Sequence, residues 1–263
     1  MPTSSTSSRR VAVVTGSSKG LGRGIAVSLA ASGCDVVVNY ATDEVGAKET
    51  AGLVEQAGGR AAVVPGDVRR PATAEALVDA AADLGGLDVW VNNAGVSVLA
   101  PVIDTEPADL VRMVDVNLMG TFHGLRAAAH HMRAAGTPGR IVNVASEVAV
   151  QAFPLLGAYG ATKFAVVGLT QAAALELAVD GITVNAVGPG TAETDMVLAE
   201  RRSEVAITGR GPDDVRAAYL DGIPAGRFCD PADAGALVAW LAGPDASYVT
   251  GQTFLVNGGS VLH

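Results

Sequence analysis

The sequence predicts a single α/β domain, a doubly wound parallel sheet of about seven strands with helices on both faces. Two observations lead to this prediction. Short runs rich in β-branched residues alternate with longer runs rich in alanine and leucine along nearly the whole chain. The short runs are apolar at consecutive positions, as expected for parallel strands whose two faces are both covered by helices.

Length and composition favour one domain. The chain has 263 residues, of which 49% are apolar and 17% are charged, and this profile supplies a core large enough to cover both faces of a sheet. No linker or internal repeat divides it. We therefore expect a catalytic domain at residues 11–263, preceded by a flexible tail at residues 1–10.

The elements follow from the pattern in chain order. Strands are expected in the segments VAVVTG, DVVVNY, AAVVPGD, LDVWVNNAG, RIVNVAS, ITVNAVGPG and TFLVNGG. Helices are expected in LGRGIAVSLAAS, EVGAKETAGLVEQA and TAEALVDAAADL, over about 107–135, in the segment that carries YGATK, and after Pro231.

One segment, at about residues 191–226, departs from this regular alternation. It is charged, is punctuated by glycine and proline, and is longer than an ordinary connection. Two interpretations are open: a surface loop with one short helix, or a lid over a substrate pocket. We favour the lid because the segment begins directly after a strand that ends in a glycine-proline motif.

Charge and cysteine content exclude several classes of function. The net charge is −9, which repels nucleic acid and anionic lipid surfaces alike. Only Cys34 and Cys229 are present, too few for a disulfide framework. No apolar run approaches the roughly 18 residues that span a bilayer, and the longest suggestive one is AGALVAWLAG. We expect a soluble cytoplasmic protein without membrane or nucleic-acid partners.

The turn after the first strand predicts a phosphate site. Its sequence is TGSSKGLG, and it opens the first helix. Glycines let the backbone approach a phosphate closely, while the helix N-terminus offers free N–H donors and a partial positive charge. A plain glycine-rich turn is the alternative. The expected dinucleotide contacts here are Gly16, Ser17, Ser18, Lys19, Gly20, Leu21 and Gly22.

The end of the second strand favours NADP(H) over NAD(H). An acidic residue at this point would bind the ribose 2′-OH and repel a 2′-phosphate. The sequence instead has the neutral residues Asn39, Tyr40 and Ala41, and Lys19 adds a positive charge nearby. Asp43 and the residue after it are acidic, and no arginine follows the strand.

Six motifs in order resemble the short-chain dehydrogenase/reductase family over nearly the whole chain. The motifs are TGSSKGLG, NNAG at 92–95, Asn117 in VDVNLMG, Ser146 in IVNVAS, YGATK at 159–163 and VGPG at 187–190. The resemblance implies a Rossmann-like fold and oxidoreductase activity. Among its branches, GRIVNVAS, DGIPAGRF and YVTGQTFLVNGG are most similar to the 3-oxoacyl-carrier-protein reductases.

The resemblance implies a catalytic set whose chemistry is consistent. Tyr159 and Lys163 are four residues apart on a helix and so can share a cavity. We expect the ammonium group, helped by a cationic nicotinamide, to lower the pKa of the phenol, which is otherwise about 10. Tyr159 then exchanges a proton with the substrate oxygen, Ser146 holds that oxygen, and Asn117 holds a water beside Lys163, which also binds the nicotinamide ribose.

Further cofactor contacts follow from the same resemblance. Ala192 stands where relatives usually have isoleucine or valine, which leaves extra room, and Glu147 is an unusual charge that is either solvated or in contact with substrate. The implied contacts are Asp67 and Val68 near the adenine, Asn93, Ala94 and Gly95 along the nucleotide, and Pro189, Gly190, Ala192 and Thr194 near the nicotinamide, besides Tyr159 and Lys163.

The substrate is left open by the sequence. We expect a small ketone or secondary alcohol, with a 3-oxoacyl-carrier-protein reductase as the alternative; the acidic chain and Asp180, at a position often basic in that branch, argue against an acidic carrier. A non-catalytic nucleotide-binding protein is less favoured. The four histidines lack the spacing of metal ligands, so no metal is expected. A homotetramer or dimer is implied, through the C-terminal segment and the two long helices.

Overall fold

The computed structural model describes residues 9–263 and contains one seven-stranded sheet in which all strands are parallel, which confirms the predicted fold class. The strand order is β3-β2-β1-β4-β5-β6-β7. Of the predicted tail, residues 1–8 lie outside the described residues; Arg10 already belongs to β1, and Arg9 forms an ion pair with the buried Asp35. The strands are β1 (Arg10–Val14), β2 (Cys34–Tyr40), β3 (Ala61–Pro65), β4 (Val89–Asn92), β5 (Arg140–Val144), β6 (Thr183–Pro189) and β7 (Thr253–Val256).

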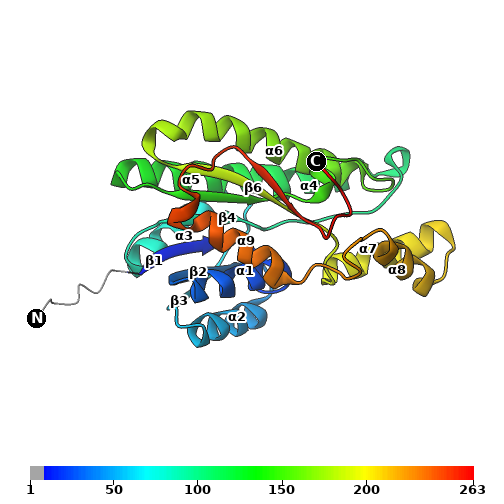
Figure 1. Cartoon of the computed structure of the whole chain (residues 1–263), viewed down its shortest axis with the longest axis horizontal. Coiled ribbons are helices and arrows are strands. Elements are labelled where there is room, and N and C mark those ends of the chain that lie inside the picture. The colour runs from blue at the N-terminus through cyan, green and yellow to red at the C-terminus, as the bar shows by residue number, and fades with distance from the viewer. Residues whose placement is uncertain (1–8) are drawn as a thin grey trace, which may run out of the picture.

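Helices cover both faces of the sheet, as Figure 1 shows. One apolar core lies between the sheet and α1, α2 and α9, and a second lies between the sheet and α3, α5 and α6. The helices are α1 (Gly20–Ala31), α2 (Glu44–Gln56), α3 (Pro71–Leu84), α4 (Pro107–Met113), α5 (Gly120–Ala135), α6 (Gly157–Leu177), α7 (Asp195–Thr208), α8 (Pro212–Asp221) and α9 (Pro231–Ala242). Short helical turns are η1 (Val102–Asp104), η2 (Val114–Met119), η3 (Glu147–Ala149), η4 (Ala178–Asp180) and η5 (Pro244–Ala246).

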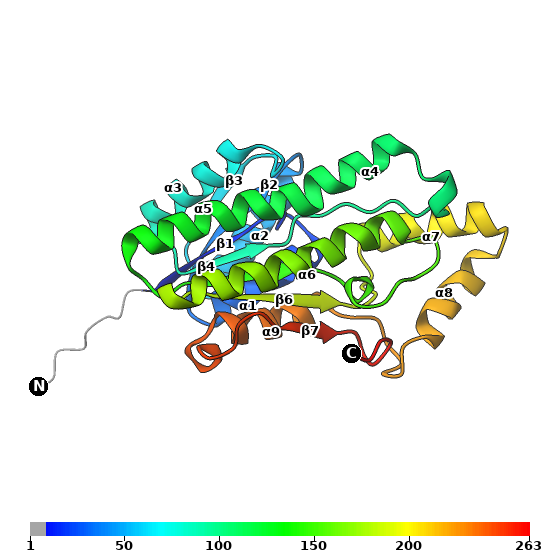
Figure 2. The same cartoon turned by 90° about the horizontal axis from the view of Figure 1, so that it is seen from above.

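The helix predicted over about 107–135 is one long rod with an irregular centre. Helices α4 and α5 are joined by η2, which is a π-helical turn, and Figure 2 shows the rod running over the sheet beside α6. Such wider turns are rare and often lie at functional sites. This turn contains Asn117.

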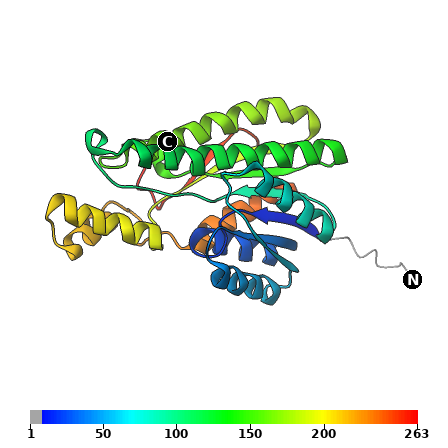
Figure 3. The same cartoon turned by 180° about the vertical axis from the view of Figure 1, so that it is seen from behind.

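The segment 191–226 contains two helices where the loop interpretation expected one. Helices α7 and α8 pack against each other and project from the body of the domain, as Figures 1 and 3 show. They lie beyond the end of the sheet toward which the strands point. The two helices are therefore placed beside the edge where ligands of parallel sheets bind.

The order of the strands reverses between β1 and β4. β1 is followed by α1 on the way to β2 at one side, whereas β4 leads to β5 at the other. In open parallel sheets a crevice forms at the carboxyl ends of the strands at such a point, and ligands bind there. The motifs TGSSKGLG and NNAG follow β1 and β4 directly, so they meet at this crevice.

One helix is long and apolar enough to cross a membrane by length and composition alone, although the sequence analysis expected none. It runs over Gly157–Asp180 and comprises α6 and η4. In the domain it packs against β6 and buries the polar side chains of Lys163 and Thr170. These contacts are those of a core helix covering a sheet.

Candidate active site

The loop between β1 and α1 is held tightly against the loop after β4. Gly16 and Gly20 have φ angles of 59° and 56°, in the left-handed region that glycine adopts without strain. A Cβ atom on Gly16 would lie 2.9 Å from the Cα of Ala94, and one on Gly22 would lie 2.5 Å from the Gly16 carbonyl oxygen. Helix α1 begins here without a side-chain cap, so its first N–H groups are free to bind an anion.

Replacing Gly22 by alanine is expected to weaken dinucleotide binding at least about tenfold, because the new methyl group pushes the backbone of the loop out of position at a cost of about 1–3 kcal/mol. Titration of the protein with NADPH, followed by nicotinamide fluorescence, measures this effect. The matched control is Gly52→Ala on α2, where a Cβ would meet no atom within 4 Å. Unchanged affinity in Gly22→Ala would contradict the role of this loop.

Asn39 supports the loop from the end of β2. Its side chain accepts a hydrogen bond from the Gly16 N–H at 3.1 Å and donates to the Val64 and Gly66 carbonyls at 3.2 and 3.1 Å. The residue is 1% exposed, so its amide is fully used within the protein. Asn39 thus fixes the shape of the glycine loop. The side chains left free at the end of β2 are those of the half-buried Tyr40 and the exposed Ala41.

Lys19 does not present the free positive charge that the sequence suggested. Its Nζ atom forms an ion pair with the Asp195 carboxylate at 2.6 Å, and this hydrogen bond raises the pKa of Lys19. Beside it, a Cβ on Gly20 would lie 3.3 Å from the Thr194 side chain. The start of α7 is therefore joined to the phosphate loop by the Lys19–Asp195 ion pair and lies close to it at Gly20.

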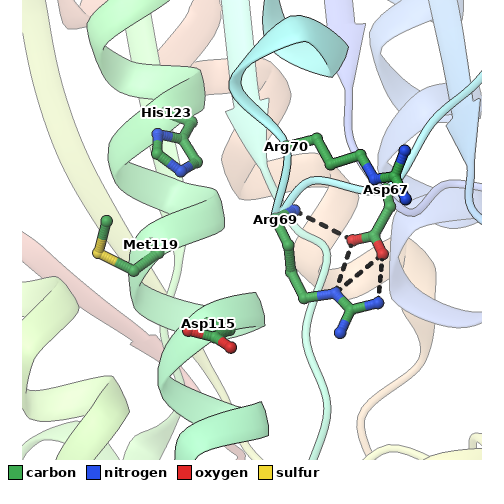
Figure 4. Close-up of a pocket in the computed structure, with 6 residues that line it drawn as sticks. All are labelled: Asp67, Arg69, Arg70, Asp115, Met119 and His123. Atoms are coloured by element: carbon green, nitrogen blue, oxygen red, sulfur yellow. Dashed lines mark hydrogen bonds and ion pairs between the residues drawn. The ribbon is translucent and has the colours of Figure 1, made fainter.

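Asp67, expected near the adenine, already has a strong partner. Its carboxylate accepts three hydrogen bonds from the Arg69 guanidinium, at 2.5 to 3.1 Å, and the same contacts lower the pKa of Asp67. Figure 4 shows this pair at a pocket also lined by Arg70, Asp115, Met119 and His123. A nucleotide base contacting Asp67 would have to share the carboxylate with Arg69.

A chain of buried amides holds α6 against the sheet. Asn92 donates from Nδ2 to Asn143 Oδ1 at 2.8 Å, and Asn143 donates from Nδ2 to Thr170 Oγ1 at 2.9 Å. All three side chains are at most 3% exposed. Because buried hydrogen bonds of this kind demand specific geometry, they fix how α6 is placed on β4 and β5.

Asn117 fixes the loop after β4 and the first turn of α6. Its side chain accepts from the Val96 N–H at 2.8 Å and donates to the Val96 carbonyl at 2.9 Å and to Thr162 Oγ1 at 3.0 Å. Thr162 in turn donates to the Tyr159 carbonyl at 2.7 Å. The side chain of Asn117 is thus a positioning group, and its part in holding a water beside Lys163 stays a prediction.

Ser146, Tyr159 and Lys163 meet at the carboxyl end of β5. The hydroxyl groups of Ser146 and Tyr159 interact, and the Lys163 Nζ atom lies 5.7 Å from the centre of the Tyr159 ring. Lys163 is 4% exposed and donates to the Val144 carbonyl at 2.8 Å. The fold therefore brings these three side chains together, and their catalytic roles stay predictions.

In the protein without a cofactor, the pKa values of Tyr159 and Lys163 are both shifted. Burial, together with the charge of Glu200, raises the pKa of Tyr159, and the Ser146 hydrogen bond only partly opposes this. Burial lowers the pKa of Lys163 to about 8. The expected lowering of the Tyr159 pKa was made for the site with a cationic nicotinamide bound, and it stays a prediction for that state.

Glu147 is buried, so it is not the solvated charge that one interpretation of the sequence expected. It is 8% exposed, and its carboxylate accepts a hydrogen bond from Ser260 Oγ in the C-terminal segment. Burial raises the pKa of Glu147. The residue therefore ties the turn that carries Ser146 to the segment after β7.

The residues after β6 cross over toward the phosphate loop. Ala192 is 3% exposed and pairs by backbone with Cys229, and Thr194 caps the N-terminus of α7. The predicted residues Val68, Asn93, Gly95, Pro189 and Gly190 also lie at the carboxyl edge of the sheet. Sequence reasoning named neither Ser97, in the loop after β4, nor Glu200, on α7, because no motif contains them.

Comparisons with known proteins agree with this geometry. Residues 16–261 match a family model described as enoyl-(acyl carrier protein) reductase. The chain is 43% identical to L-2,3-butanediol dehydrogenase of Corynebacterium glutamicum, over 97% of this chain and 99% of that protein. The chain is a short-chain dehydrogenase/reductase.

Other members of the family extend the comparison. The chain is 43% identical to 3beta-hydroxysteroid dehydrogenase 1 of Eggerthella lenta, over 97% of this chain and 94% of that protein. A solved structure from Agrobacterium tumefaciens, provisionally assigned as a 2-deoxy-d-gluconate 3-dehydrogenase with bound NADP, has a TM-score of 0.83 and 35% identity, and covers 95% of this chain and 96% of that one.

Membership of this family makes the chain an enzyme, an oxidoreductase that interconverts alcohols and ketones with a nicotinamide cofactor. The alternative of a non-catalytic nucleotide-binding protein is thereby set aside. Within residues 9–263, no group of three or more histidine, cysteine, aspartate or glutamate side chains is arranged to hold a metal ion.

Proposed function

We propose that the protein is an NADP(H)-preferring oxidoreductase of ketones and secondary alcohols, with Tyr159 as the general acid and base. The observation that supports this most is the meeting of Ser146, Tyr159 and Lys163 at the carboxyl end of β5, where Lys163 lies close to Gly95 in the loop after β4. A bound nicotinamide would supply the hydride for the carbonyl carbon. The loop of close-packed glycines and the buried Lys163 fit such a cofactor.

In reduction, side chains of the protein would supply the proton and stabilise the negative charge that develops on the substrate oxygen. Ser146 donates a hydrogen bond to the substrate oxygen and holds it beside the Tyr159 hydroxyl. Because burial raises the pKa of Tyr159, the phenol is protonated at neutral pH and can give its proton to the developing alkoxide. In oxidation the same proton returns to Tyr159, and the charge of Lys163 favours the phenolate that must receive it.

The preference for NADP(H) rests on the edge at β2. The last residue of β2 is the half-buried Tyr40, so this position carries no carboxylate group. The related Agrobacterium tumefaciens structure has NADP bound. Replacing Tyr40 by aspartate is expected to lower the affinity for NADPH at least about tenfold relative to NADH, because the new carboxylate repels a 2′-phosphate.

Binding constants for both reduced cofactors, measured by fluorescence titration, test this expectation. Tyr40→Asn is the matched control, since it removes the ring but adds no charge. If the ratio of the NADPH and NADH binding constants is the same in Tyr40→Asp and in Tyr40→Asn, the 2′-phosphate does not lie at this edge.

The alternative substrate is an acyl group on a carrier protein, and the description of the matching family model also names an acyl carrier protein. The charge of the chain disfavours it. The net charge of −9 repels an acidic carrier, and the acidic Asp180 is paired with Arg133 at 3.0 Å, which neutralises that arginine. We therefore propose a free small molecule as the substrate.

Three further features complete the proposal. The segment 191–226 acts as a lid, since α7 is joined to the phosphate loop through Lys19 and Asp195.

The protein works in the cytoplasm, where Cys34 and Cys229 stay reduced, as both are unpaired in the fold. It assembles as a homotetramer or dimer through exposed apolar side chains on α6 and near the C-terminus, among them Leu175 and Leu262 at 82% and 89% exposure.

Oxidation of NADPH in the presence of a panel of ketones tests the proposed function. We expect turnover with at least one small ketone and the reverse reaction with the matching secondary alcohol. Tight NADPH binding without turnover of any carbonyl compound would refute it.

A further inference from the structure

Glu147 is a buried carboxylate, next in the chain to Ser146, that the proposed reaction does not use. It is 8% exposed, and within residues 9–263 no lysine, arginine or histidine forms an ion pair with it. Burying a carboxylate without a cation costs free energy that a neutral side chain of similar size would avoid. Such a group is a candidate for a role in function, and its contacts indicate which role.

The direction of the Ser146 hydroxyl depends on the short turn η3. Ser146 is the N-cap of this turn, and its Oγ atom accepts a hydrogen bond from the Val148 N–H at 3.3 Å. The Ser146 carbonyl accepts from the Ala149 N–H at 3.0 Å. Both donors belong to η3, so a shift of the turn moves the serine. Glu147 is the one residue of η3 with a polar side chain.

The side chain of Glu147 is held by the C-terminal turn, residues 257–261, which lies far along the chain. The carboxylate accepts a hydrogen bond from Ser260 Oγ, 113 positions away. The Ser260 hydroxyl has one proton and also lies 3.0 Å from the Asn257 carbonyl oxygen, but a carboxylate is the stronger acceptor. This link therefore connects the serine turn at the end of β5 with the chain after β7.

The C-terminal turn is itself fixed by hydrogen bonds, so it can serve as an anchor. Asn257 donates from Nδ2 to the Val261 carbonyl at 2.8 Å and accepts at Oδ1 from the Gly259 N–H at 3.1 Å. Outside the turn, the Gly258 carbonyl accepts from the Ala225 N–H at 2.9 Å, at the end of the lid segment. An acceptor side chain attached to this anchor has a defined position.

We propose that Glu147 is a positioning residue whose carboxylate, held by Ser260, keeps η3 in place and so keeps the Ser146 hydroxyl directed at the substrate oxygen. This inference rests on the proposed function. Glu147 acts through Ser146 and does not touch the substrate. Because a misplacement of about 1 Å can slow a reaction about 10²-fold, loss of the link should appear in turnover and not in cofactor binding.

Replacing Glu147 by alanine is expected to lower kcat for ketone reduction at least about tenfold, while the dissociation constant of NADPH changes less than about twofold. Glu147→Gln should keep at least about half of the wild-type kcat, because its amide oxygen can still accept from Ser260. Steady-state kinetics and fluorescence titration measure the two quantities. The matched control is Glu55→Ala, which removes an exposed carboxylate on α2 and should change neither.

Two further sets of variants show through which groups Glu147 acts. Ser260→Ala should also lower kcat, and the double variant should match Glu147→Ala within about twofold, since the two residues form one link. In Ser146→Ala, which is already slowed by loss of the hydroxyl, adding Glu147→Ala should lower kcat less than about twofold further, because no hydroxyl is left to misplace.

Two results would overturn this inference. One is a further loss of about tenfold from Glu147→Ala in the Ser146→Ala background, since the carboxylate would then act on the substrate or on the fold as a whole. The other is equal kcat in the wild type and in Ser260→Ala, a change at a half-buried position that does not depend on the folding of a Glu147 variant. No reduction of any ketone by the wild type would refute the proposed function itself.

Discussion

Replacing Tyr159 by phenylalanine is expected to lower kcat for ketone reduction by about 10³- to 10⁴-fold while the dissociation constant of NADPH changes less than about twofold. The variant loses only the hydroxyl group that protonates the alkoxide, and a positioned general acid contributes a factor of this order. The half-buried ring keeps its packing without the hydroxyl group, and no cofactor contact of the phosphate loop depends on the phenol oxygen. Steady-state kinetics and fluorescence titration measure the two quantities.

The control for this variant is Tyr248→Phe. Tyr248 is fully exposed, so loss of its hydroxyl should change neither quantity. Equal loss of cofactor affinity and turnover in Tyr159→Phe would mean that the residue holds the site together and does not transfer the proton. Full activity would remove Tyr159 from the mechanism.

Replacing Lys163 by methionine is expected to stabilise the protein without cofactor by about 2 kcal/mol and to lower kcat/KM at least about 10²-fold. Lys163 is 4% exposed, and its pKa of about 8 lies well below the 10.5 of a free lysine. This difference corresponds to a cost of about 3 kcal/mol for burying the charge. Loss of the hydrogen bond to the Val144 carbonyl offsets about 1 kcal/mol of the gain.

The pH dependence of this stabilisation gives a second check. The folded pKa of Lys163 is lowered, so the cost of its charge is fully present below pH 8 and is relieved as pH rises from about 8 toward 10.5. The stability difference between Lys163→Met and the wild type should therefore shrink over that range. Urea unfolding at several pH values measures it, with the exposed Lys48→Met as control.

A less stable Lys163→Met variant at pH 7 would show that Lys163 stabilises the fold as a structural group. The expected result instead describes a residue kept for function at a cost in stability, since the buried ammonium group is useful only when it acts on Tyr159 and the cofactor.

The fold could be predicted from the sequence because its signals are local. Consecutive β-branched residues identify each strand, and glycines identify the turn after β1, where a Cβ on Gly22 would meet backbone atoms. The proposed catalytic group could be predicted because Tyr159 and Lys163 share one helix, and the family resemblance added Ser146. Each of these signals lies within a few residues of the structure that it specifies.

The remaining features depend on contacts between distant parts of the chain. Neither the ion pair of Lys19 with Asp195 nor the burial of Glu147 under Ser260 has a signature in the sequence. The raised pKa of Tyr159 follows from desolvation, which only the packed structure determines.

In the proposed reaction, Tyr159 protonates the oxygen while a hydride passes from NADPH to the ketone carbon. This is tested most directly by incubating the enzyme with NADPH that carries deuterium at the reactive nicotinamide carbon, in each stereochemical form, together with a hydroxyketone. Mass spectrometry should find one deuterium on the carbinol carbon of the alcohol for one of the two forms, and Tyr159→Phe should give almost no product. Alcohol without the label from either form, or labelled alcohol formed at the wild-type rate by Tyr159→Phe, would contradict the claim.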